Sequence, residues 1–179
     1  DPGRTVDDLQ KLSDTYQTPY FFFTDECLAL SPTKRLCQQM IDRNLNLHWT
    51  CEMRFEKNLS RDLLGLMRDA GCLKIVFGLE SFNQRVMDFM KKGIKQESVR
   101  RITEDCLDLG IAVHCYIIVG FPTEQEHEAL ETMNFVVGNT RLNSSYGFSC
   151  QPCLFDLEKE APIMSDPGSY GIRRILRPA

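Results

Sequence analysis

Short apolar runs typical of strands alternate with amphipathic helical segments along most of this 179-residue sequence. Five runs have strand character, and they occupy residues 19–24, 47–54, 72–78, 111–119 and 146–151. Helical patterns separate these runs, and another helical pattern precedes the first. An alternating order of β and α segments is typical of a parallel sheet with right-handed crossover connections. We therefore expect an α/β fold built around one parallel sheet.

Residues that can cap a helix N-terminus predict where the helices begin. They are Thr5, Ser31 with Pro32 after it, Ser60, and Thr123 with Glu126 at capping-box spacing. Gly71 follows the third helical pattern and predicts its end. The last segment of the chain has turn signals at Ala161-Pro162 and Pro167-Gly168. We therefore expect a core of residues 1–155 and an extended tail of residues 156–179.

Composition argues against several classes of function. The net charge of −4 and the isoelectric point near 5.4 do not favour nucleic acid, because binding phosphate requires a basic surface. The sequence contains no apolar stretch long enough to span a membrane, and its first residues have no apolar signal region. We therefore expect a cytoplasmic protein that binds neither nucleic acid nor membranes.

The eight cysteines are scattered through apolar segments, unlike the loop-borne disulfide framework of a small secreted protein. Most are expected to be reduced and buried. Cys150 and Cys153 alone form a C-x-x-C pair, and a structural zinc site needs four ligands. We therefore interpret this pair as structural.

Polar residues follow four of the expected strands at the point where each strand ends. The carboxyl ends of parallel strands meet at one edge of the sheet, where such folds bind their ligands. Carboxylates at Glu26 and Glu80 can accept hydrogen bonds from an ammonium group or ribose hydroxyls. The Arg54 guanidinium can donate two hydrogen bonds to a carboxylate. Gly120 has no side chain, so the backbone there can approach a flat ring closely. The pattern predicts a site for a small zwitterion or polyol.

The motifs FFFTDEC, WTCEMRF, AGCLKIVFGLESFNQRVMDFMKKG and GIAVHCYIIVGFPTE occur in this order. Together they resemble the radical S-adenosylmethionine (SAM) superfamily, and most closely the branch that often carries an upstream cobalamin-binding domain. The resemblance covers residues 5–138. It implies a partial (β/α)6 TIM-like barrel with five βα units, in an enzyme that forms a 5′-deoxyadenosyl radical to modify a small-molecule or peptide substrate. It also implies SAM, a [4Fe–4S] cluster, an external electron donor and, through an upstream domain, cobalamin.

The resemblance also assigns site residues for the methionyl part of SAM. Asp25 and Glu26 stand where the superfamily contacts the amino group. Arg54 is the candidate for the methionyl carboxylate. Lys92, in the K-K-G run, corresponds to a cation near that carboxylate, although a lysine at a helix end can equally be a solvated surface residue.

For the nucleoside part of SAM, the resemblance points to the ends of the third and fourth strands. Glu80 and Ser81 match the position that contacts the ribose, and Gly120 and Pro122 lie in the segment that packs on adenine. Thr123 stands where a glycine is common in the superfamily.

The C-x-x-x-C-x-x-C motif that binds the cluster in this superfamily is missing from the sequence. We expect the first strand and the cluster loop to lie upstream of Asp1, so that this chain alone is inactive; the alternative is a member that lost its cluster. Two further hypotheses are a non-catalytic α/β scaffold or partner-binding module, and a cluster-free barrel enzyme that uses Glu26 and Glu80 as acid and base.

Overall fold

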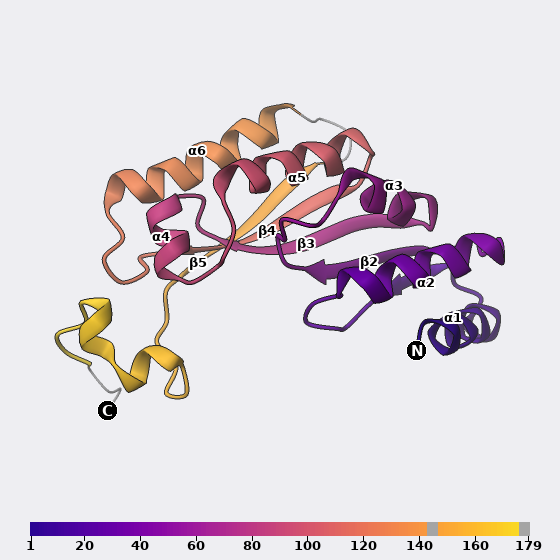
Figure 1. The fold of residues 1–179 in the computed structure, drawn as a ribbon, viewed down its shortest axis with the longest axis horizontal. Helices are drawn as coiled ribbons and strands as arrows, with labels where there is room; N and C mark the ends of the chain where they lie inside the picture. The colour runs from indigo at the N-terminus through magenta and orange to yellow at the C-terminus, as the bar shows by residue number, and fades with distance from the viewer. Residues whose placement is uncertain (143–146, 176–179) are drawn as a thin grey trace.

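The described part of this computed structural model, residues 1–142 and 147–175, contains one sheet of five parallel strands (Figure 1). The strands lie in chain order: β1 (Tyr20–Phe22), β2 (His48–Met53), β3 (Cys72–Glu80), β4 (Ala112–Val119) and β5 (Phe148–Leu154). Each neighbouring pair is parallel, and β1 and β5 are the two edges of an open sheet within the described residues. The predicted α/β fold with a parallel sheet is confirmed. Its barrel is not closed.

The helices form a layer on one face of the sheet. They are α1 (Pro2–Tyr16), α2 (Leu30–Asp42), α3 (Arg61–Asp69), α4 (Gln84–Phe89), α5 (Gln96–Asp108) and α6 (Glu126–Leu142). Neighbouring contacts run from α1 to α2, to α3 and to α5, while α6 packs against β5 (Figure 1). None of the helices in the described part of the chain has both the length and the apolar character needed to cross a membrane.

Successive side chains of a strand point to opposite faces of the sheet. One face is buried under the helices, and the open face is accessible to solvent. In β2, Trp49, Cys51 and Met53 are buried in the core, whereas Thr50 and Glu52 between them are only half-buried. Alternate apolar residues of β3 and β4 join the same core. The helix layer therefore covers one face, and the other face carries polar side chains together with exposed aromatic rings at β1.

The predicted starts of the first two helices are wrong by a few residues. Asp1 caps α1, with its carboxylate accepting a hydrogen bond from the Gly3 N–H at 2.8 Å, so Thr5 lies inside the helix. The helix α2 begins at Leu30, before Ser31. The predicted cap at Ser60 is confirmed by its bond to the Leu63 N–H at 3.2 Å. The N-cap of α2 is Ala29, which makes no side-chain hydrogen bond, so a nearby polar residue does not by itself decide where a helix begins.

The segment after β5 is not simply extended. It contains two short 3₁₀ helices, Pro162–Ser165 and Pro167–Tyr170, each with a proline in its first turn. The ring of Tyr170 packs on Phe89 and Phe121, with centroids 5.1 and 6.4 Å away. This part of the tail therefore folds back on α4 and on the loop after β4. The predicted start of the last strand, Tyr146, lies outside the described residues.

Candidate functional site

Glu80, the last residue of β3, has an unusual backbone conformation. Its φ angle is +65°, in the left-handed region that glycine favours, and the pairing of β3 with β4 is irregular between Gly78 and Glu80. Such a conformation costs about 1–3 kcal/mol for a residue with a side chain. Strain of this kind persists only where the surrounding structure enforces it, and it is common at binding sites.

The carboxylate of Glu80 forms an ion pair with Lys92. Its Oε1 atom lies 3.2 Å from Lys92 Nζ, and each side chain is only about one-fifth exposed. Gly78 leaves space for this pair, because a Cβ atom there would lie 2.7 Å from Glu80 Oε1 and 3.7 Å from Lys92 Nζ. Arg54, at the end of β2, lines a small recess together with Gly78 and Lys92. The structure thus brings together Arg54, Glu80 and Lys92, three of the predicted site residues.

Ser81 does not join this group. Its side chain is fully buried, and its Oγ atom lies 3.2 Å from the Thr132 hydroxyl on α6. It also accepts a hydrogen bond from the Asn83 N–H at 3.2 Å, while the Phe82 N–H donates to the same Thr132 hydroxyl at 2.9 Å. The Ser81 side chain is therefore directed toward the helix layer, where it supports the turn that follows Glu80.

Asp25 and Glu26 are exposed in the loop between β1 and α2. Asp25 lines a groove of about 290 Å³ together with Asp1 and Pro2 at the start of α1. Among the described residues, no salt bridge joins Asp25 or Glu26 to Lys92. The loop follows β1, two strands away from β3 and thus about 10 Å across the sheet.

The loop between β4 and α6 contains two residues in the left-handed region, Gly120 with φ +80° and Thr123 with φ +67°. The Gly120 N–H donates to Glu124 Oε2 at 2.7 Å, and Pro122 is half-buried. The prediction that Thr123 caps the following helix is wrong: α6 begins only at Glu126, and the Thr123 hydroxyl accepts a hydrogen bond from Arg85.

Arg85 and Glu128 form an ion pair that the sequence did not indicate. Arg85 Nε lies 2.6 Å from Glu128 Oε1, and Arg85 Nη2 lies 2.5 Å from Glu128 Oε2. The Glu128 side chain is 5% exposed, and it also accepts a hydrogen bond from the Gln125 N–H at 2.8 Å. The Arg85 hydrogen bonds hold the pKa of Glu128 at about 2, so this carboxyl stays ionised. The two residues are 43 positions apart, so no local sequence pattern predicts that they pair.

The open face of the sheet carries a second set of polar side chains that sequence reasoning missed. The Tyr116 hydroxyl donates to Glu52 Oε1 at 3.4 Å, and His114 Nδ1 lies 2.9 Å from Ser149 Oγ. The charge of Glu52 raises the pKa of Tyr116, whereas burial and the nearby Lys74 lower the pKa of His114. Alternation along β2, β4 and β5 could have predicted that these residues share a face.

The described cysteines do not fit an iron–sulfur cluster. All eight thiols are unpaired, and no group of three or more metal-ligating side chains gathers within the described residues. Cys150 and Cys153 are three positions apart on β5 and so point to opposite faces. Burial raises the pKa of Cys37 to about 12, which disfavours the thiolate that binds metals.

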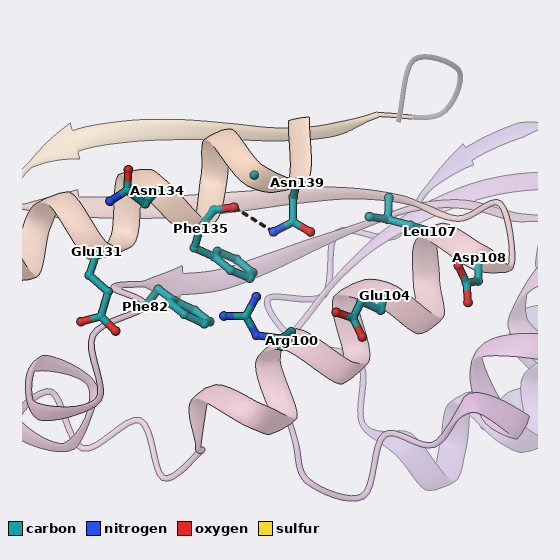
Figure 2. A pocket seen from close by; sticks show the side chains of 10 residues that line it. Phe82, Arg100, Glu104, Leu107, Asp108, Glu131, Asn134, Phe135 and Asn139 are labelled. Atoms are coloured by element: carbon teal, nitrogen blue, oxygen red, sulfur yellow. Dashed lines mark hydrogen bonds between the residues drawn. The ribbon is translucent and has the colours of Figure 1, made fainter. Parts of the chain in front are cut away.

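A groove of about 570 Å³ lies between α5 and α6, and Phe82 also lines it (Figure 2). The guanidinium of Arg100 lies 5.2 Å from the ring centroid of Phe82 and 5.8 Å from that of Phe135. These two rings are stacked, with centroids 3.9 Å apart. None of the predicted site residues lines this groove.

A family model described as the radical SAM superfamily matches residues 2–136. The chain is 29% identical over 136 residues to an anaerobic magnesium-protoporphyrin IX monomethyl ester cyclase of Rubrivivax gelatinosus, covering 74% of this chain and 24% of the cyclase. It is 24% identical over 134 residues to an uncharacterized methyltransferase of Pyrococcus horikoshii, covering 74% of this chain and 29% of that protein. The chain thus spans only about a quarter of the length of these relatives.

The fold is similar to that of the radical SAM methyltransferase TsrM from Kitasatospora setae, solved with cobalamin and a [4Fe–4S] cluster bound. The TM-score is 0.73 at 15% sequence identity, and the match covers 86% of this chain and 31% of TsrM. At this identity the likeness concerns the fold alone.

Proposed function

Because the chain belongs to the radical SAM superfamily, we propose that it is the part of a radical SAM enzyme that binds SAM along the carboxyl edge of its sheet. The observation that carries this proposal is the left-handed conformation of Glu80, which directs its carboxylate to Lys92 beside Arg54. A carboxylate and two cations, held where parallel strands end, complement a ligand that has hydroxyls, an ammonium group and a carboxylate.

In this proposal the nucleoside and methionyl parts of SAM bind different parts of the carboxyl edge of the sheet. The Glu80 carboxylate accepts hydrogen bonds from the ribose hydroxyls, and the backbone at Gly120 and Pro122 contacts adenine. The methionyl carboxylate binds Arg54 and Lys92. The exposed carboxylates that follow β1, Asp25 and Glu26, receive the methionyl ammonium group. Ser81 contributes only by supporting the turn after Glu80.

The radical chemistry of the superfamily is assigned to the parent enzyme and not to residues of this chain. We propose that the cluster ligands come from outside this chain, since its described cysteines do not fit them. An external electron donor, a cobalamin-binding domain and a small-molecule or peptide substrate complete the proposal. A cytoplasmic location is consistent with eight unpaired thiols.

Calorimetric titration of the full-length protein with SAM tests this proposal. We expect Glu80→Gln to weaken SAM binding about 10- to 150-fold, because one desolvated, charge-assisted hydrogen bond contributes about 1.5–3 kcal/mol. The matched control is Glu104→Gln, since Glu104 is an exposed glutamate on α5. Equal affinities for wild type and Glu80→Gln would contradict the assignment.

The same titration addresses the alternatives. A wild-type protein without any affinity for SAM would favour the non-catalytic scaffold, or a cluster-free enzyme that uses Glu26 and Glu80. The latter would also retain activity after iron is removed.

A further inference from the structure

The loop between β4 and α6 is held in a conformation that its own sequence disfavours. Thr123 has a φ angle of +67°. A β-branched residue rarely adopts positive φ, because its side chain crowds the backbone in that region. Contacts from outside the loop must therefore select this conformation.

Arg85 supplies two of those contacts. Its Nη1 atom donates to the Thr123 hydroxyl at 3.1 Å, and its Nη2 atom donates to the Thr123 carbonyl oxygen at 2.9 Å. A guanidinium has a rigid, planar set of donors, so these two bonds fix both the side chain and the peptide plane of Thr123.

Glu128 in turn holds Arg85 in place. Its carboxylate accepts the Nε and Nη2 bonds of Arg85 and the Gln125 N–H. Glu128 is nearly fully buried, at the start of α6, whereas about half of the Arg85 side chain is exposed. The buried Glu128 carboxylate thus orients the Arg85 guanidinium, and the guanidinium in turn orients Thr123.

The network joins two segments of the proposed SAM site. Arg85 lies on α4, five residues after Glu80, while Thr123 lies three residues after Gly120. The loop has further supports: Gly120 is held through Glu124, and the buried ring of Phe121 packs edge-on against Phe89 of α4, with centroids 6.0 Å apart. Neither of these supports contacts Thr123, so neither fixes its backbone angles. Among the described residues, Arg85 is the side chain that joins the loop to α4 by hydrogen bonds.

We propose that Arg85 and Glu128 are positioning residues that hold Thr123 in its left-handed conformation and so fix the adenine-contacting loop relative to Glu80. This inference rests on the proposed function. It assigns no contact with SAM to either residue. Their effect on SAM binding passes through the backbone of residues 120–123.

The test uses SAM affinities of the full-length protein, measured by calorimetry together with thermal unfolding. Arg85→Gln/Glu128→Gln removes both charges at once, which avoids leaving a buried carboxylate without a partner. We expect it to weaken SAM binding about tenfold, equivalent to about 1.4 kcal/mol. Adding Thr123→Gly should restore affinity to within about threefold of wild type, because glycine adopts positive φ without help.

The matched control is Arg61→Gln/Asp105→Asn, which removes an ion pair between α3 and α5 and should leave SAM affinity unchanged. If the Arg85/Glu128 variant does not fold, Arg85→Lys serves instead, with an intermediate loss and the same rescue by Thr123→Gly. Wild-type affinity in the Arg85/Glu128 variant would overturn the positioning role and leave the proposed function intact. A loss that Thr123→Gly does not restore would also overturn it. Failure of wild type itself to bind SAM would instead reject the proposed function.

Discussion

Three backbone features at the end of β3 together direct the Glu80 carboxylate to Lys92. The irregular pairing with β4 shifts the register, the φ angle of +65° turns the chain, and Gly78 leaves the space that the carboxylate fills. A glutamate in a regular strand at the same position would point elsewhere. The conformation of Glu80 therefore matters to the proposed site as much as its charge does.

Gly78→Ala tests this arrangement. The added Cβ would lie 2.7 Å from Glu80 Oε1, so the carboxylate must move away from Lys92. We expect SAM affinity to fall about tenfold, which is about 1.4 kcal/mol. The free energy of unfolding should change by less than about 1 kcal/mol, because the displaced atom ends a flexible side chain.

The control is Gly65→Ala on α3, where an added Cβ meets no atom within 4 Å. This change should stabilise the protein by about 0.5–1 kcal/mol, because alanine favours a helix, and leave SAM affinity unaltered. Unchanged SAM affinity in Gly78→Ala would argue against the role of the Glu80 carboxylate.

At the scale of elements, β1 is a short strand at one edge of the sheet. It is three residues long and pairs with β2 on one side within the described residues. Tyr20 and Phe22 are 64% and 55% exposed. An edge with unpaired backbone groups and apolar side chains can pair with the edge of another chain.

We therefore expect the isolated chain to self-associate, and Phe22→Lys to reduce this association by placing a charge on the edge. Light scattering over a concentration series measures the effect. Tyr16→Lys is the control, because Tyr16 is an exposed aromatic residue at the end of α1 and makes no strand pairing. A monomeric wild-type chain at high concentration would contradict this expectation.

At the scale of the whole molecule, buried charge couples stability to pH. The pKa of Glu128 is about 2 in the folded chain and near its ordinary value of 4.5 when unfolded. Below pH 4.5 the unfolded chain binds a proton that the folded chain does not, so stability falls as the pH drops toward 2. Above that window, the contribution of Glu128 is fully present.

Urea unfolding between pH 2 and pH 6 measures this dependence. We expect the stability of Arg85→Gln/Glu128→Gln to fall less steeply with decreasing pH than that of wild type. The control pair, Arg61→Gln/Asp105→Asn, leaves the Arg85–Glu128 ion pair in place, so its stability should still fall as Glu128 is protonated. Identical slopes for wild type and the Arg85/Glu128 variant would show that Glu128 is not the group that titrates.

The sequence by itself determined the order of the elements and the character of the sheet. Alternating apolar and amphipathic segments are local patterns, and a strand buried on its helix side needs apolar residues whatever surrounds it. The predicted strands at residues 47–54 and 111–119 therefore agree closely with β2 and β4. Glu80 was identified for the same reason, because a charged residue directly after an apolar strand marks its exit.

Only the tertiary structure decided which side chains meet. Ser81 follows Glu80 directly, yet it faces α6 while Glu80 reaches Lys92. Arg85 and Glu128 lie 43 residues apart and have no local signature. The physical reason is that a side chain's direction depends on the backbone angles and on packing between distant segments. The backbone angles and the packing are determined when the sheet and its helices assemble, so a short stretch of sequence does not predict them.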